Sequence, residues 1–376
     1  MSAVSVHTVA ATSGALAVLN HPASPIAEAT RIHPARTSAI FLPTDLCCNG
    51  SNDILSYCIM EVNRSQMSRR DATRLMAQGA AGLLLTRSSF GADSTEQMSN
   101  IALVKRTIPS SGESLPVLGL GTWQAFDVGP AQSERQPVEE VLALFTKLGG
   151  RLVDSSPMYG RAEQVIGDIA SKLPLRSSLF LATKVWTAGK QQGIDSMERS
   201  FAKLQAQQID LMQVHNLVDV RTQLATLRAW KEQGRVRYLG ITHYVSSAYS
   251  EVAKLLRSEK LDFVQINYSL LEREAEDQIL PLAQDRGVAV IVNRPFGGGD
   301  LFARVRQKPL PEWAAEFDCH SWAQFLLKWI VAHPAVTCAI PATSNARHLE
   351  DNMQGGVDRL PDTKLRQRMV EVVSGL

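Results

Sequence analysis

The sequence predicts an α/β fold over residues 101–376, a (β/α)8 or TIM barrel with an N-terminal β-hairpin, and a non-globular leader before it. Three observations indicate the barrel. Eight short apolar runs recur along the chain, amphipathic segments with helical spacing separate them, and the runs leave no polar face for water. Strands of this composition belong to parallel sheets that are buried on both sides. Eight such units in about 275 residues match the usual size of a barrel.

The strands are placed by these apolar runs and by the turn formers between them. A hairpin is expected from residues 101–107 and 115–120, because Ser110, Ser111 and Gly112 lie between the two segments. The barrel strands are expected at residues 118–122, 151–154, 179–184, 209–215, 236–242, 263–267, 288–293 and 336–340.

Helices are expected between the strands, where apolar residues recur every three or four positions. Pro137 suits the first turn of one helix, and Gly149 suits its end. A last helix is expected at residues 363–373. The other apolar stripes, which we interpret as faces that pack on the sheet, are Ile194/Met197/Phe201/Leu204, Leu224/Leu227/Trp230, Tyr249/Val252/Leu255/Leu256 and Trp322/Phe325/Leu326/Trp329/Ile330.

A doubly wound open sheet is the main alternative to the barrel. Such a sheet would carry a Gly-x-Gly-x-x-Gly turn that opens a helix and binds a dinucleotide. The chain has Gly119 and Gly121, but Gln124 stands where the third glycine is needed, and a long polar stretch follows. The sequence therefore favours the barrel.

Composition excludes several classes of function. Lys and Arg total 39 and Asp and Glu total 37, and the resulting net charge of +2 argues against an electrostatic nucleic-acid binder. No apolar run reaches the roughly 20 residues that a stable membrane span needs. The five cysteines show neither a disulfide framework nor zinc-site spacing, so we expect no metal. We expect a monomer.

Residues 67–92 have the three-part layout of an export signal. Arg69 and Arg70 precede twelve uncharged residues rich in Ala, Gly and Leu, and small residues follow. The start resembles a twin-arginine signal, although Asp71 and Thr73 depart from the usual pattern. This predicts export to the periplasm. The alternative is an ordinary amphipathic or disordered extension on a cytoplasmic protein.

Residues 1–66 precede that signal and show no sustained helical or strand period. We expect them to be disordered, or to be translated upstream sequence. A signal of this kind belongs at the start of a protein, and Met67 is therefore the expected initiator.

Polar residues end three successive predicted strands. Asp154, Lys184 and His215 stand at these ends, 30 and 31 residues apart, and Tyr159 lies in the loop after Asp154. One such residue alone usually caps a turn or satisfies a backbone group. The carboxyl ends of barrel strands form one mouth, so four such residues at one depth indicate a catalytic site there.

These residues are similar to those of the aldo/keto reductase family. The resemblance runs in order over about residues 101–376 and does not cover the first hundred. The matching stretches are Leu118-Gly119-Leu120-Gly121-Thr122-Trp123, Val153-Asp154 through Tyr159-Gly160, Thr183-Lys184-Val185-Trp186, Gln213-Val214-His215-Asn216, Leu239-Gly240-Ile241-Thr242, Gln265-Ile266-Asn267-Tyr268 and Ile340-Pro341-Ala342-Thr343-Ser344.

The resemblance implies a barrel that reduces aldehydes, ketones or sugar carbonyls with a nicotinamide dinucleotide, usually NADP, with NAD as the alternative. Tyr159 would be the general acid. Its ordinary pKa of about 10 is high for this task, and the charge of Lys184 would lower it. Asp154 would pair with Lys184, and His215 would orient the carbonyl of the small-molecule substrate.

The resemblance also implies positions for the nicotinamide half of the cofactor. Thr242 and Gln265 match positions that hold the carboxamide, although the usual Ser-Asn pair reads Thr242-His243 here. Asn293 stands where the family has a stacking tyrosine, which leaves open whether Arg294, Phe296 or no residue replaces it.

The phosphates would lie against glycines and a helix N-terminus. Residues 297–299 are three glycines, which can present backbone N–H groups to a pyrophosphate. Ser344 or Asn345 can cap the helix after the eighth strand, and Arg347 is the best candidate for the 2′-phosphate. Ala342, where some family members have lysine, weakens this preference for NADP. The expected cofactor residues are Gly121, Thr122, Thr242, Gln265, Asn293, Arg294, Pro295, Phe296, Ser344, Arg347 and Asn352.

Trp123 and Trp186 follow the first and third strands and are expected to form apolar walls of a substrate pocket, with packing under loops as the alternative. A cofactor-binding barrel with a sensory role and little turnover is the alternative function, but the intact catalytic set favours an enzyme. An unrelated barrel lyase or hydrolase would need paired carboxylates or metal ligands at the strand ends, and the sequence shows none.

Overall fold

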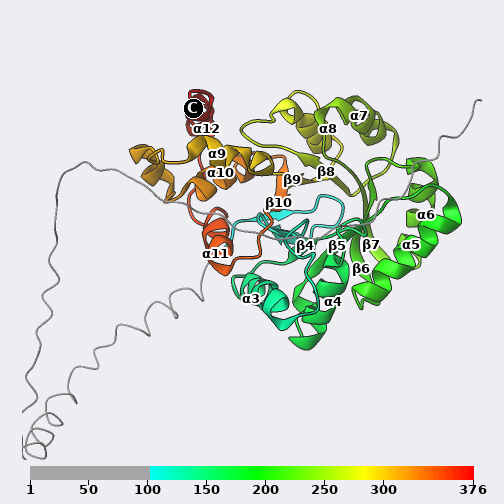
Figure 1. The fold of residues 1–376 in the computed structure, drawn as a ribbon. Helices are drawn as coiled ribbons and strands as arrows, with labels where there is room; N and C mark the ends of the chain where they lie inside the picture. The colour runs from blue at the N-terminus through cyan, green and yellow to red at the C-terminus, as the bar shows by residue number, and fades with distance from the viewer. Residues whose placement is uncertain (1–101) are drawn as a thin grey trace, which may run out of the picture. The chain divides into compact units, whose positions relative to one another are not determined.

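The computed structural model describes residues 102–376, so the predicted segments 1–66 and 67–92 lie outside the described residues. Eight parallel strands form one sheet in chain order from β3 to β10. Bridges from Leu118 to Ala339 and from Gly121 to Ala342 join its two edges and close the barrel. Helices surround these strands (Figure 1), as the predicted (β/α)8 barrel requires.

The observed strands agree closely with the predicted runs. Two of them, β6 and β8, have the predicted bounds. Strand β3 is the shortest, and Leu118, two residues before it, pairs only through an isolated bridge to Ala339. The barrel strands are β3 (Leu120–Gly121), β4 (Leu152–Asp154), β5 (Phe180–Val185), β6 (Ile209–His215), β7 (Val236–His243), β8 (Phe263–Asn267), β9 (Ala289–Asn293) and β10 (Val336–Ala339).

The helices follow the strands, with extra segments between β9 and β10 and at the end. The α-helices are α3 (Gln132–Lys147), α4 (Ala162–Lys172), α5 (Lys190–Lys203), α6 (Val220–Glu232), α7 (Tyr249–Ser258), α8 (Ile279–Asp285), α9 (Asp300–Val305), α10 (Trp322–Val331), α11 (Ala346–Gln354) and α12 (Thr363–Ser374). Short 3-10 helices are η2 (Arg176–Ser178), η3 (Ser246–Ala248), η4 (Glu274–Glu276), η5 (Gly297–Gly299) and η6 (Glu312–Phe317).

Pro137 was predicted to lie in the first turn of its helix, and this prediction was wrong. Helix α3 begins at Gln132, and Pro137 lies inside it. The residues before the proline are polar, and most are exposed. Apolar spacing therefore could not reveal that the helix begins more than a turn earlier.

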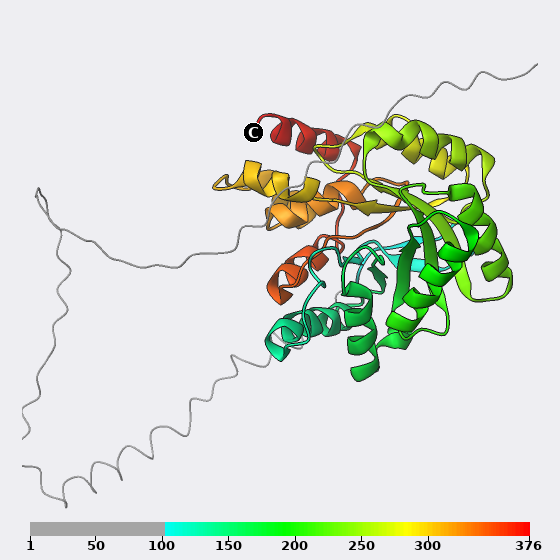
Figure 2. The same cartoon turned by 45° about the vertical axis from the view of Figure 1, so that its right-hand side comes forward.

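Helix α12 packs on α10, beside it in Figure 2. The indole nitrogen of Trp329 on α10 donates a hydrogen bond to the carbonyl of Arg366 on α12, at 3.2 Å. The guanidinium of Arg366 lies 4.7 Å from the centre of the same ring. Among residues 102–376, no helix has the length and apolar composition of a membrane span.

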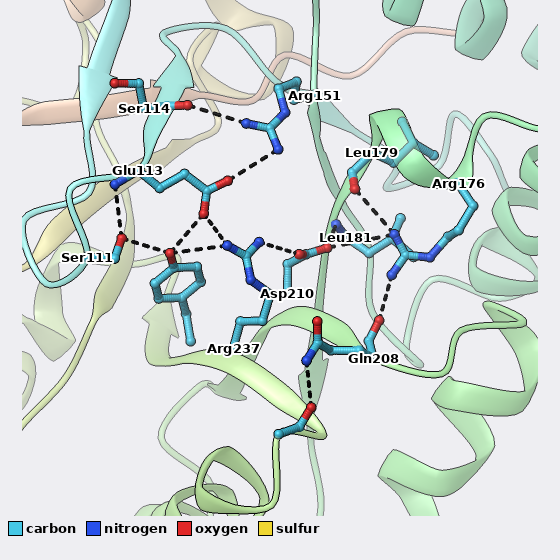
Figure 3. Close-up of polar contacts among 12 residues, drawn as sticks. Ser111, Glu113, Ser114, Arg151, Arg176, Leu179, Leu181, Gln208, Asp210 and Arg237 are labelled. Carbon is cyan, nitrogen blue, oxygen red and sulfur yellow. Dashed lines mark hydrogen bonds and ion pairs between the residues drawn. The ribbon is translucent and has the colours of Figure 1, made fainter.

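The predicted hairpin closes the end of the barrel where the strands begin. Strands β1 (Lys105–Thr107) and β2 (Ser114–Pro116) pair antiparallel. Between them, Glu113 accepts hydrogen bonds from Arg151, Arg237 and the hydroxyl of Tyr238 (Figure 3). Arg237 also donates to Asp210 at 2.7 Å, which ties the hairpin to the starts of β6 and β7.

The interior of the barrel follows the two-residue period of its strands. A cluster of buried side chains from the hairpin and from seven barrel strands or their ends fills the half near the hairpin. Toward the other end, the inward positions change from apolar to polar: Leu152 is followed by Asp154, Ala182 by Lys184, Leu211 by Gln213 and Phe263 by Gln265. A second cluster packs between the strands and the helices.

Candidate active site

A buried ion pair lies where the apolar interior ends. The Nζ atom of Lys184 on β5 lies 2.6 Å from Oδ2 of Asp154 on β4, and both side chains are almost fully buried. Lys184 also donates to the carbonyl of Ser155 at 2.7 Å, and Gln265 donates to Oδ1 of Asp154 at 2.9 Å. Gln213 on β6 also donates to Oδ1, at 3.4 Å. The carboxylate is thus held by three donors from three further strands.

The ion pair keeps Lys184 charged. Burial alone lowers the pKa of a lysine, because a dry interior favours the neutral amine. Burial is the largest single effect, but the charges of Asp154 and Tyr159 and the hydrogen bonds to them together outweigh it, so the pKa of Lys184 lies above its ordinary value. A fixed positive charge therefore stands inside the barrel at any physiological pH.

Tyr159 lies beside this charge, but its pKa moves opposite to our expectation. The Nζ atom of Lys184 is 5.0 Å from the centre of the Tyr159 ring. Burial raises the pKa of Tyr159 and is the largest effect, while the charge of Lys184 lowers it without compensating fully. Lys184 thus lowers the pKa of Tyr159 as predicted, but the loss of hydration on burial is the larger effect, so the net shift is upward. Tyr159 is therefore held in its protonated, proton-donating form.

His215 at the end of β6 completes the set. Its ring centre lies 6.2 Å from that of Tyr159, with the planes nearly perpendicular. Burial, with smaller contributions from the charges of Lys184 and His243, lowers the pKa of His215 to about 3. The imidazole is therefore neutral at physiological pH and can donate or accept a hydrogen bond without carrying charge.

A cavity of about 1030 Å³ opens beside these residues. That is the upper end of the range for sites that hold a cofactor or ligand, roughly 300–1000 Å³. Lys184 lies behind Asp154 and Tyr159 and does not line it. The expected site residues that line it are Gly121, Thr122, Trp123, Asp154, Tyr159, Trp186, His215, Thr242, Gln265, Asn293, Arg294, Pro295, Phe296 and Ser344.

Two expected cofactor residues are not brought to the cavity. Arg347 is exposed on the first turn of α11, and Asn352 is buried further along that helix. The lining residue of this helix is His348. Asn345, not Ser344, caps the helix, because its side chain accepts from the backbone N–H groups of Arg347 and His348.

The glycine segment has a backbone that only glycine adopts easily. Gly297, Gly298 and Gly299 have φ angles of 60°, 72° and 108°, all in the left-handed region. Gly298 and Gly299 line the cavity, and a Cβ atom on Gly298 would lie 3.1 Å from the guanidinium of Arg294. Arg294 is itself left-handed and lies 3.7 Å from the carboxylate of Glu272.

The residues present fit a dinucleotide. The Oδ1 atoms of Asn216 and Asn293 are buried without a hydrogen-bond partner among residues 102–376, and both residues line the cavity. Such atoms are acceptors that a bound amide can satisfy. Thr242 donates to Gln265 at 2.9 Å, so the two residues expected near the carboxamide are already joined to each other and to Asp154.

Sequence reasoning missed several lining residues. Met158, Tyr244 and Phe302 line the mouth, and all three side chains are exposed. Met158 and Tyr244 come within two residues of a predicted site residue or strand end, which is a usable signal. Phe302 lies on α9, and only the fold of the segment after β9 brings it there.

Comparison with known proteins agrees with this geometry. Residues 117–367 match the aldo/keto reductase family, so the chain belongs to that family. It is 29% identical over 256 residues to methylglyoxal reductase YeaE of Escherichia coli, covering 66% of this chain and 88% of that protein. It is 25% identical over 229 residues to the NADH-specific methylglyoxal reductase of E. coli, covering 53% and 69%.

Solved structures show the same fold. An aldo/keto reductase from Klebsiella pneumoniae, solved in complex with NADP and acetate, superimposes with a TM-score of 0.62 at 24% identity, covering 72% of this chain and 96% of that one. The holo form of aldo-keto reductase AKR11C1 from Bacillus halodurans gives a TM-score of 0.58 at 23% identity, with the same coverage.

Proposed function

We propose that this chain is an NAD(P)H-dependent reductase of aldehydes and ketones with Tyr159 as its general acid. The observation that carries the proposal is that Tyr159, His215 and Asp154 line one cavity, with Lys184 paired to Asp154 and 5.0 Å from the ring centre of Tyr159. Membership of the aldo/keto reductase family supports it, as do relatives named methylglyoxal reductases.

Each side chain has a distinct part in this chemistry. A bound reduced nicotinamide dinucleotide supplies the hydride, which the side chains cannot. The substrate oxygen gains negative charge as its carbon is reduced, and Tyr159 donates the proton that neutralises it. Lys184 stabilises the phenolate that Tyr159 becomes, Asp154 keeps Lys184 charged, and neutral His215 holds the carbonyl by a hydrogen bond.

We infer that NADP is preferred to NAD. The N-terminus of α11, capped by Asn345, adjoins the cavity, and helix N-termini favour phosphate. Arg347 and His348 lie on its first turn, and His348 lines the cavity. Titration of the protein with NADPH and with NADH, followed by quenching of tryptophan fluorescence, tests the preference, and tighter binding of NADH would contradict it.

The test of the function is turnover. Purified protein with NADPH and methylglyoxal, a panel of aldehydes or a panel of ketones should consume NADPH, followed by its absorbance. Tyr159→Phe should lower kcat by about a hundredfold or more, the usual contribution of a general acid, while NADPH binding stays within about twofold. NADPH binding without turnover of any carbonyl would favour a sensory role, and near-normal kcat in Tyr159→Phe would remove the assigned acid.

We also propose that the protein is exported as a folded, cofactor-loaded molecule through the twin-arginine route. The support is the pattern of residues 67–92, which lie outside the described structure. A reductase outside the cytoplasm would lack a supply of reduced nicotinamide. A route that carries folded proteins would answer this, provided that the cofactor is retained tightly and recycled by a second substrate.

A further inference from the structure

The loop after β4 places a second buried hydroxyl against the active-site imidazole. Ser156 is fully buried, and its Oγ atom lies 3.2 Å from Nδ1 of His215. The same Oγ accepts the backbone N–H of Met158, also at 3.2 Å. Among the described residues, Ser156 provides the side chain that forms a hydrogen bond with the ring of His215.

The hydrogen bonds of Ser156 determine which way its proton points. A serine hydroxyl has one proton and two acceptor lone pairs. One lone pair takes the N–H of Met158, and Nδ1 of His215 is the acceptor that remains within reach of the proton. The reverse arrangement, with Nδ1 protonated, would leave a buried hydroxyl proton with no acceptor in the described part of the chain.

The state of His215 follows from this arrangement. The ring is neutral and carries one proton. Because Nδ1 accepts from Ser156, that proton resides on Nε2. His215 lines the cavity, and Nε2 is the ring nitrogen left for a ligand there. A donor at Nε2 is what a carbonyl oxygen needs, since that oxygen only accepts.

We propose that Ser156 is a positioning residue that fixes the tautomer of His215 and so presents Nε2–H to the substrate carbonyl. Its effect on catalysis rests on the proposed reductase function, but its effect on the tautomer does not. The groups around the ring that bear charge or titrate are Lys184, Tyr159 and His243.

The experiment measures the tautomer directly. Protein labelled with 15N-histidine is studied by long-range 1H–15N NMR, which separates protonated from unprotonated ring nitrogens, and His215→Gln assigns the signals. The wild-type ring is expected to show Nε2–H. Ser156→Ala should give Nδ1–H or a mixture, and Ser156→Thr should restore Nε2–H. Ser155→Ala should keep the wild-type spectrum, because the Ser155 hydroxyl has no hydrogen-bond partner in the described part of the chain.

Turnover supplies the second readout. Ser156→Ala should lower kcat about tenfold, the rate equivalent of one neutral hydrogen bond, with the NADPH dissociation constant unchanged. Ser156→Thr should recover most of the loss. A wild-type spectrum with Nδ1–H, or Ser156→Ala retaining pure Nε2–H, overturns the proposal even if one variant folds poorly. An inactive wild type with Nε2–H would contradict the reductase function and support the role of Ser156.

A separate observation concerns the mouth of the cavity. Six large hydrophobic side chains are more than a third exposed among residues 102–376, and five of them line this cavity. Their exposed fractions run from 40% to 52%, and exposed apolar side chains gathered at one cavity are typical of a ligand-binding site. The five are Trp123, Met158, Trp186, Tyr244 and Phe302.

Charge is nearly absent from the same lining. Among the described residues that line the cavity, Asp154 and Arg294 are the only members of the Asp, Glu, Lys and Arg set. Asp154 is paired with Lys184, and Arg294 lies 3.7 Å from Glu272 and beside Gly298, on the cofactor side. Among residues 102–376, no unpaired Lys or Arg lines the cavity beside Trp123, Met158 and Trp186 to neutralise an acidic substrate.

We infer that the site selects uncharged carbonyl compounds with a bulky apolar substituent over those with a carboxylate or phosphate. This deepens the proposed function and rests on it. Stacking on the exposed aromatic rings favours such substrates, while an anion would lose its hydration without gaining a partner.

Matched substrate pairs test the inference. The kcat/KM for benzaldehyde should exceed that for 4-carboxybenzaldehyde, and phenylglyoxal should exceed methylglyoxal, each by about tenfold or more. Trp186→Ala should reduce both preferences, while Trp313→Phe, away from the cavity, should not. Preference for the carboxylate would overturn the inference. Binding of both benzaldehydes to Tyr159→Phe, measured by fluorescence, tests the same preference without turnover. A failure of this inference can therefore be told apart from a failure of the reductase function.

Discussion

At the scale of single residues, the charges of Lys184 and Asp154 can be buried only because each is paired with the other. Removing one partner leaves an uncompensated buried charge, which costs several times more than the net contribution of the pair. Lys184 also lowers the pKa of Tyr159 against the effect of burial, so its loss would raise that pKa further. The pair therefore acts on Tyr159 as one unit.

This unit predicts a non-additive mutant cycle. Lys184→Met and Asp154→Asn should each lower kcat/KM by at least about tenfold, and the double variant should lose no more than Lys184→Met alone. Steady-state kinetics of the three variants measure the coupling. Lys231→Met is the matched control, because Lys231 forms a 2.6 Å pair with Asp262 near the starts of the strands and should keep full activity. If the losses of the two single variants multiply in the double variant, the two residues act independently.

His215 predicts a pH dependence of stability. Its pKa is near 6.5 when unfolded and about 3 when folded, so between these values the unfolded chain binds a proton that the folded protein does not. The free energy of unfolding should therefore fall as the pH decreases from about 6.5 toward 3. His333, whose pKa falls to about 4, acts in the same direction.

Urea unfolding between about pH 3 and pH 6.5 checks whether the free energy of unfolding falls on acidification. His215→Gln should show a smaller loss of stability on acidification than wild type, because one proton-linked group is gone. His320→Gln, at an exposed position, should keep the wild-type dependence. Equal pH dependence in wild type and His215→Gln would show that burial of His215 does not contribute.

At the scale of elements, the glycine segment between β9 and α9 combines backbone strain with a place on the cavity wall. Gly298→Ala puts a side chain at a φ of 72°, and its Cβ atom would meet the guanidinium of Arg294. We expect a loss of stability of about 1–2 kcal/mol from the left-handed backbone and an NADPH dissociation constant raised by about tenfold.

Gly112→Ala separates the two effects. Gly112 has a φ of 79° in the hairpin turn, and nothing lies within 4 Å of an added Cβ atom. Thermal unfolding should therefore show a similar loss of stability for Gly112→Ala, while fluorescence titration should show unchanged NADPH binding. If the two variants bind NADPH equally well, the glycine segment has no part in cofactor binding.

At the scale of the whole molecule, the leader and the barrel should be separable. Replacing Arg69 and Arg70 with two lysines should trap the protein in the cytoplasm and leave its purified activity unchanged, because the pair lies outside residues 101–376. Cell fractionation with immunoblotting measures the location. The control exchanges Arg199 and Arg221, both exposed on the barrel, for lysine. A wild type found wholly in the cytoplasm with residues 67–92 still attached would end the export proposal.

The architecture and the candidate catalytic residues could be predicted from the sequence. Strand and helix periods are local properties of the chain, so the eight strands could be placed within two residues, and the (β/α)8 closure followed from their number and burial. The equal spacing of Asp154, Lys184 and His215 at strand ends put them at one mouth, because parallel strands of a barrel share a direction. The resemblance to known reductases then assigned their roles.

The protonation and contacts of those residues could not be predicted without the folded structure. The pKa of Tyr159 depends on burial against the charge of Lys184, two opposing effects whose balance requires distances and solvent exposure. Ser156 meets His215 across 59 residues of sequence, and His348 lines the cavity where Arg347 was expected, because the turn of α11 decides which side chain faces inward. Periodicity places elements along the chain, but packing alone fixes which side chains meet and how much water they lose.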